Sequence, residues 1–244
     1  MQYQQINVTN LLDKTFATFR VIYLPLLIIG LPAVILFVLL YFLPESSTQY
    51  YWLYWFLVVL INPWLFAIRY LYIYKYLRGI RISLVQAFRR GFKKFISLAI
   101  LSLITLDPLI LIKDKLRSNI GLSILFYISL IYFATRIGFY EQMVLIEGTS
   151  PFRAITRSWQ LTKGYFWVII RANLIFFVVF CFPMFLFDTI LESILNLIPI
   201  TSALRQDILS DIIRYFAGPT LSSIFSVLLY MELKKIKRID ISKT

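Results

Sequence analysis

Long apolar runs alternate with short polar connections along most of this chain. Six of these runs are near the length that a membrane span needs, because a helix rises 1.5 Å per residue and about 20 apolar residues cross a hydrocarbon layer. The pattern predicts an all-α, polytopic integral membrane protein. The predicted spans are 21–43, 51–74, 95–112, 121–146, 165–187 and 212–233.

Three other stretches carry apolar side chains at helical spacing on one face and basic side chains on the other. Ser83 has the spacing of a capping box before 84–94, and Ser150 precedes a proline at the start of 151–163. The third stretch is 10–20, directly before the first span. Each is expected to be an amphipathic helix lying in the membrane interface on the cytoplasmic side.

Lysine and arginine are distributed unevenly between alternate connections. Seventeen lie in the N-terminal segment, in 75–94, in 147–164 and after residue 233, whereas only four lie in 44–50, 113–120 and 188–211. Basic connections stay in the cytoplasm, so both termini are expected on that side of a bacterial plasma membrane or an equivalent internal membrane. The net charge of +13 then favours anionic lipid as a partner rather than nucleic acid.

A set of small and basic residues recurs after 67 positions. Each member of the first set has an identical residue in the second. The first set is Ala67, Arg69, Ser83, Ala87 and Arg90, and the second is Ala134, Arg136, Ser150, Ala154 and Arg157. The repeat favours three transmembrane hairpins, each with an interfacial helix, of which the N-terminal copy has diverged most. Chance matching of small and basic residues is the alternative.

The composition excludes several kinds of chemistry. The chain has no histidine and one cysteine, Cys181, which removes histidine-based acid–base catalysis and histidine–cysteine zinc sites. No glycine-rich phosphate loop or nucleophile elbow is present. We therefore expect a single membrane domain over 1–244 that is not an enzyme and uses no cofactor or metal.

Charged residues inside the predicted spans are the first candidates for a site, because an ionised group costs at least about 2.5 kcal/mol at the bilayer centre. Four lie in the cytoplasmic half: Arg69, Arg136, Glu141 and Arg171. They predict a basic pocket for a lipid headgroup or an internal charge cluster. A purely structural role is the alternative, in which Glu141 pairs with Arg136 or Arg171 while Arg69 extends to the interface.

The basic faces of the two interfacial helices are the second set of candidates. These residues are expected to contact anionic headgroups, and they are Arg89, Arg90, Lys93, Lys94, Arg153 and Arg157.

Three stretches carry a family resemblance. Residues 154–167 (AITRSWQLTKGYFW) closely resemble the A-x-x-R-S-W-x-L-T-K-G-x-F-W stretch of bacterial membrane proteins that are similar to the membrane domain of glycerophosphoryl diester phosphodiesterases. Residues 11–16 (LLDKTF) and 228–234 (LLYMELK) resemble the opening and closing motifs of that domain. The resemblance implies a six-helix membrane domain, which in some relatives precedes a soluble phosphodiesterase barrel. It implies no catalytic residue in this chain.

Two functions are compatible with these features. The first is a non-enzymatic membrane protein that binds anionic lipid or serves as an accessory subunit of a membrane complex. The alternative is a small transporter or channel, because prolines interrupt most of the spans and can free backbone groups to line a path. Those prolines are Pro25, Pro32, Pro63, Pro108, Pro183 and Pro219.

Overall fold

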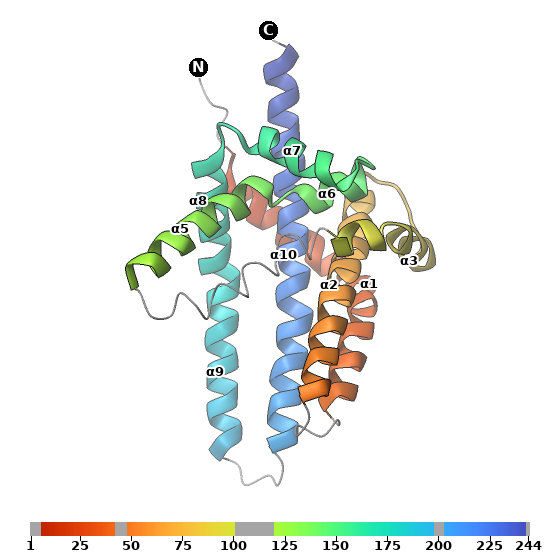
Figure 1. Ribbon diagram of the computed structural model, residues 1–244, viewed down its shortest axis with the longest axis vertical. Coiled ribbons are helices and arrows are strands. Elements are labelled where there is room, and N and C mark those ends of the chain that lie inside the picture. Colours follow the sequence, from red (N-terminus) through yellow and green to blue (C-terminus); the bar gives the residue numbers. More distant parts are fainter. Residues whose placement is uncertain (1–5, 42–47, 101–119, 198–202, 243–244) are drawn as a thin grey trace.

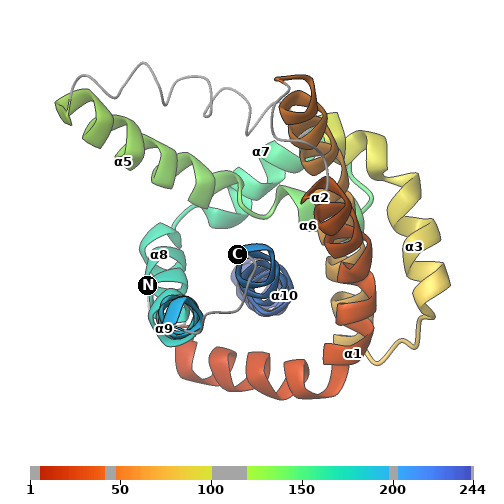
Figure 2. The same ribbon diagram turned by 90° about the horizontal axis from the view of Figure 1, so that it is seen from below.

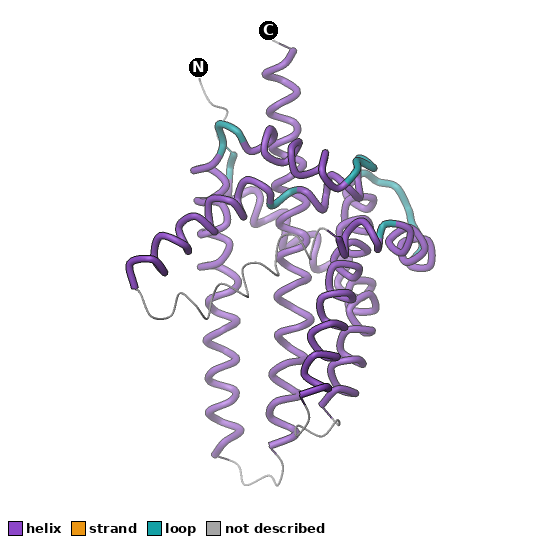
Figure 3. The backbone as a smooth tube through the Cα atoms, in the orientation of Figure 1, coloured by secondary structure: helices purple, strands orange, loops and turns teal. Residues whose placement is uncertain are grey.

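A computed structural model describes residues 6–41, 48–100, 120–197 and 203–242. These ranges contain helices joined by short turns and no strand, as expected for an all-α protein (Figure 3). The named helices are α1 (Val8–Tyr41), α2 (Thr48–Leu77), α3 (Leu84–Lys93), α5 (Ile120–Ile137), α6 (Tyr140–Ile146), α7 (Pro151–Thr162), α8 (Phe166–Phe176), the π-helix η1 (Phe177–Cys181), α9 (Phe182–Leu197) and α10 (Ala203–Ser242). Most of the predicted span 95–112 lies outside the described residues.

The long helix α10 lies in the middle of the described structure, and α1, α2, α7 and α9 pack against it (Figures 1 and 2). The short helices α3, α6 and α7 lie across one end of the molecule. The C-terminal end of α10 extends past α7 at that same end (Figure 1). The short amphipathic helices and the lysine-rich end of α10 therefore share one side of the fold.

The core forms where side chains of α1, α2, α8 and α10 meet. Leu26, Ile68, Phe225 and Tyr230 are almost completely buried there. The ring of Phe176 stacks on Phe225 with the centroids 4.3 Å apart. Packing of this kind holds membrane helices together, since lipid tails are as apolar as the side chains themselves.

Large apolar side chains cover much of the outer surface as well. On α5, for example, Ile124, Leu125 and Ile128 are each more than half exposed. Three described stretches are long and apolar enough to cross a membrane: Val8–Ile35, Ser123–Ile146 and Phe166–Phe187. These features indicate a membrane protein.

The N-terminal part of the chain differs from the expected order of a separate interfacial helix and a span. Residues 10–20 and the described part of the predicted span 21–43, up to Tyr41, belong to one helix, α1, which carries Pro25 and Pro32 inside it. Figure 2 shows that the first part of α1 runs across the molecule and then turns to lie beside α2. Proline removes an intrahelical hydrogen bond, so it permits such a bend without ending the helix.

The predicted span 121–146 is interrupted, because α5 ends at Ile137 and α6 begins at Tyr140. The hydroxyl of Ser158 on α7 donates to the carbonyl oxygen of Arg136 (3.0 Å) and accepts from the backbone N–H of Phe139 (3.2 Å). The hydroxyl of Thr162 donates to the same carbonyl oxygen (3.2 Å). Side chains of α7 thus supply the hydrogen bonds that the broken helix lacks.

Helices α3 and α7 cover 84–93 and 151–162, close to the predicted ranges. The Ser83 hydroxyl accepts from the backbone N–H of Gln86 (3.2 Å), which is the bond expected of an N-cap. Pro151 occupies the first turn of α7, and Gly164 follows that helix with a φ of +87°, a conformation that favours glycine.

Candidate functional site

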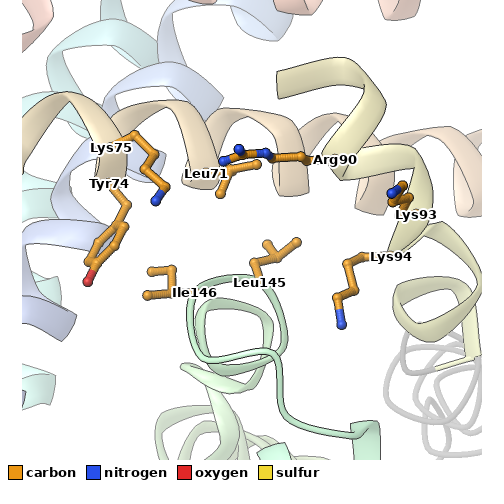
Figure 4. A pocket seen from close by; sticks show the side chains of 8 residues that line it. All are labelled: Leu71, Tyr74, Lys75, Arg90, Lys93, Lys94, Leu145 and Ile146. Carbon is orange, nitrogen blue, oxygen red and sulfur yellow. The ribbon is translucent and has the colours of Figure 1, made fainter. Parts of the chain in front are cut away.

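A cavity of about 260 Å³ lies where the end of α2, the helix α3 and the end of α6 meet (Figure 4). We call it the basic pocket. It is lined by Leu71, Tyr74 and Lys75 from α2, Arg90, Lys93 and Lys94 from α3 and the turn after it, and Leu145 and Ile146 from α6. Four of these eight side chains are basic and none is acidic.

Close packing of α3 on α2 positions the basic side chains. Gly91 is buried against Ile68, and a Cβ atom at position 91 would lie only 2.5 Å from the Cγ1 of Ile68. Ala87 is also fully buried on this face of α3. Two small residues therefore let the helices approach, which brings Arg90 and Lys93 near the last turn of α2.

The basic side chains stand on two walls of the pocket. Figure 4 shows Tyr74 and Lys75 on the α2 side and Arg90, Lys93 and Lys94 on the α3 side, with Leu145 and Ile146 between them. In the part of the chain that the structure describes, no ion pair involves any of these four cations. The pocket is thus a positively charged concavity with an apolar floor, which suits an amphipathic anion.

Three of the six basic residues predicted on the interfacial helices, Arg90, Lys93 and Lys94, line this pocket. Arg89 is exposed on α3 and does not line it. The sequence patterns pointed to neither Lys75 nor Tyr74 as part of a site. Lys75 is in the last turn of α2, and only the return of α3 along α2 brings it opposite Arg90.

The basic residues of α7 have a different environment. Arg153 is exposed, whereas the guanidinium of Arg157 pairs with the Glu147 carboxylate at 3.2 Å. The other carboxylate oxygen of Glu147 accepts from the Lys234 ammonium (2.7 Å) and from the Tyr230 hydroxyl. We call these four residues the Glu147 cluster, which ties the end of α6 to α7 and α10.

The charge of Glu147 is stabilised by this cluster. Burial alone raises the pKa of Glu147, but the hydrogen bonds from Lys234 and Tyr230 and the charges of Lys234 and Arg157 outweigh it. The pKa of Glu147 therefore lies below its ordinary value. Arg157 is paired within this cluster, whereas Arg90 has no ion pair among the residues that the structure describes.

The four charged residues predicted inside the spans have different surroundings. Arg69 is only 4% exposed, and its guanidinium carbon lies 5.6 Å from the centre of the Phe66 ring. It does not extend to the surface as the structural alternative expected. Glu141 accepts from the hydroxyl of Tyr140 (3.3 Å), and Arg171 is exposed on α8. Among the described residues, no ion pair joins Glu141 to an arginine.

Arg136 lies among aromatic rings at the end of α5. Its guanidinium carbon is 5.2 Å from the ring centre of Tyr132, 5.5 Å from that of Trp159 and 5.8 Å from that of Phe166. Cation–π attraction of this kind stabilises a partly desolvated guanidinium. Arg136 therefore joins α5 to α7 and α8, a role that its position in the sequence alone did not reveal.

Comparisons of the chain with protein-family models, with curated proteins and with solved structures found no match. The resemblance to a phosphodiesterase membrane domain therefore stays a prediction.

Proposed function

We propose that this protein is a non-enzymatic integral membrane protein that binds the headgroups of anionic lipids in the basic pocket. The observation that carries the proposal is the convergence of Lys75, Arg90, Lys93 and Lys94 on one cavity with no acidic side chain in its lining. Arginine and lysine are strong donors to phosphate oxygens, and charge-assisted hydrogen bonds are about twice as strong as neutral ones.

The proposed topology has six spans arranged as three hairpins, with both termini in the cytoplasm. Two features support it. The basic pocket, α7 and the C-terminal end of α10 lie toward the same end of the fold, and most lysines and arginines of the connections belong to that side. The pocket then faces the inner leaflet, where anionic lipids attract clustered basic residues with about 1 kcal/mol per residue.

The surroundings of the pocket also suit a lipid rather than a fully soluble anion. Leu71, Leu145 and Ile146 form apolar parts of the lining. Phe92 and Ile96, next to the basic residues of α3, are 66% and 71% exposed. A headgroup held by the cations would place its glycerol and acyl chains against these apolar side chains.

The test is a binding measurement on the full-length protein in nanodiscs with and without phosphatidylglycerol, read by native mass spectrometry. The double variant K75A/R90A is expected to lose retained lipid. The matched control R89A removes a charge from the same helix without touching the pocket, and it is expected to bind like the wild type. Equal retention by all three proteins would refute the site.

Salt dependence gives a second reading of the same experiment. Screening weakens exposed charge pairs as ionic strength rises, so retention by the wild type should fall with salt. Retention by K75A/R90A should be less sensitive, because two of the four contributing charges are missing. A protein partner in a membrane complex would instead copurify with both forms.

A transporter or channel is the second candidate, and one observation favours it. A cavity of about 250 Å³ lies between α5, α8 and α10, with the polar side chains of Thr135, Asn173 and Ser226 in its lining. The π-helix η1 follows α8, only a few residues beyond Asn173, and π-helical turns are frequent at functional sites. Solute flux into proteoliposomes that is abolished by N173L but not by R90A would support transport over headgroup binding.

A further inference from the structure

The amount of positive charge around the basic pocket points to a particular class of ligand. We propose that the pocket prefers a phosphate monoester over a phosphate diester, an inference that rests on the proposed headgroup site. A diester carries one negative charge, whereas a phosphate monoester carries about −1.5 to −2 at pH 7. A single negative charge would leave most of the charge of four cations uncompensated.

The placement of the cations on two walls supports the same preference. Figure 4 shows Lys75 of α2 on one side of Leu71 and the side chain of Arg90 extending toward Leu71 from α3. A monoester has three terminal oxygens that accept hydrogen bonds, whereas a diester has two and is substituted on both sides. A monoester can therefore contact both walls at once while its one substituent leaves the pocket.

The size of the pocket limits the headgroup. Its volume of about 260 Å³ lies below the range of roughly 300–1,000 Å³ that holds drug-sized ligands. A phosphate with its glycerol carbons suits this space better than a large sugar or inositol headgroup. The apolar floor of Leu145 and Ile146 would then contact the glycerol and the first acyl carbons.

Three other basic residues near this end of the fold are already engaged. Arg157 and Lys234 share Glu147, and three aromatic rings surround the guanidinium of Arg136. Selectivity for a doubly charged ligand should therefore depend on residues of the basic pocket and not on Arg136, Arg157 or Lys234.

The experiment compares the full-length protein in phosphatidylcholine nanodiscs that contain equal fractions of phosphatidic acid, a monoester, or phosphatidylglycerol, a diester. At about pH 8 we expect phosphatidic acid to bind about tenfold more tightly, the effect of one further strong charge contact. The preference should shrink at about pH 5.5, because the second pKa of a monoester is near 6. The titratable and charged side chains in the lining of the pocket are Tyr74 and the four cations.

Soluble probes distinguish a lipid from a free phosphate compound. Inorganic phosphate and glycerol 3-phosphate are added to the protein in nanodiscs of phosphatidylcholine alone. Tight binding of glycerol 3-phosphate that R90Q removes would keep the monoester preference and make the ligand soluble. Weak binding of both probes beside tight binding of phosphatidic acid would make the ligand a lipid.

Variants separate a failure of this inference from a failure of the proposed function. K75Q and R90Q should each reduce the preference for phosphatidic acid, whereas R89Q should keep it, with folding checked by thermal unfolding. Equal binding of the two lipids that R90Q weakens would overturn the monoester preference and leave headgroup binding intact. Binding of both lipids that no pocket variant changes would overturn both.

Discussion

Two regions of this protein have the same local sequence pattern, but the arginine that both contain has a different environment in each. The first is the end of α2 with α3, and the second is α6 with α7. In each, a glycine with positive φ (Gly79, Gly148) follows the first helix and a serine occupies the N-cap position of the next. An alanine is fully buried one turn later in both, at positions 87 and 154.

The two regions differ at the position ten residues before the shared arginine, which is Arg90 in α3 and Arg157 in α7. Arg157 pairs with Glu147, ten residues earlier. The residue ten positions before Arg90 is Ile80, which is 47% exposed and offers no charge. The arginine of α7 therefore takes part in an ion pair between structural elements, whereas the arginine of α3 lines a cavity. One carboxylate, present or missing, separates a structural role from the proposed binding role.

The largest expected effect comes from removing that carboxylate. E147Q keeps the shape but removes the negative charge that Arg157 and Lys234 share, so two cations lose their counter-ion in a partly buried place. Hydrogen bonds to charged groups contribute about 1.5–3 kcal/mol, and we expect a loss of about 3 kcal/mol in the free energy of unfolding. Thermal unfolding in detergent measures it, and an unchanged midpoint would contradict the role of the cluster.

The pH dependence of stability checks the same cluster without a structural change. Because the folded-state pKa of Glu147 is depressed, its contribution is complete above the unfolded-state pKa of about 4.3 and is lost as pH falls through the lower, folded-state pKa. The wild type should lose stability relative to E147Q over that acidic range. Parallel curves for the two proteins would show that Glu147 is not stabilised in the folded state.

The second largest effect is expected from Ser158 of α7, which hydrogen-bonds to both sides of the break between α5 and α6. S158A removes the hydroxyl that bonds the Phe139 N–H and the Arg136 carbonyl, in a fully buried position. An unsatisfied buried group costs about 1–3 kcal/mol, so we expect unfolding to become easier by about 2 kcal/mol. T156A provides a matched control, since Thr156 is exposed and bonds only within its own helix.

The third effect concerns the corresponding residue of α3, 67 positions earlier. G91A places a Cβ atom where Ile68 already stands, and overpacking of this kind costs about 1–3 kcal/mol. We expect a loss near the lower limit, about 1 kcal/mol, together with weaker retention of anionic lipid because α3 moves away from α2. Full retention of lipid in the nanodisc assay would show that the pocket does not depend on this contact.

The smallest expected effect tests the comparison directly by making the first region like the second. I80E introduces a carboxylate at the position equivalent to Glu147. Because an exposed ion pair is worth about 0.2–1 kcal/mol, we expect it to weaken anionic lipid binding a few-fold by competing for Arg90. I80Q is the uncharged control. Stronger binding in I80E would contradict the view that the missing carboxylate leaves the pocket open.

The sequence patterns located several features from local chemistry alone. The capping serine of α3 and the proline at the start of α7 mark helix starts that the structure places within a residue of the prediction. The break between α5 and α6 was not visible, because 121–146 is mostly apolar and long enough for one span, and the groups that stabilise the break come from Ser158 and Thr162 on α7. Lys75 was missed as a pocket residue for the same reason, since its partners belong to another helix.

What the sequence by itself determined is the all-helical membrane character, because period, length and apolar composition are properties of consecutive residues. What only the tertiary structure decided is the environment of each charge. Arg90 and Arg157 occupy equivalent positions in the sequence pattern, yet one lines a cavity and the other pairs with Glu147. Coulomb attraction and desolvation depend on distances across helices, and those distances arise only when α2, α3, α6, α7 and α10 pack.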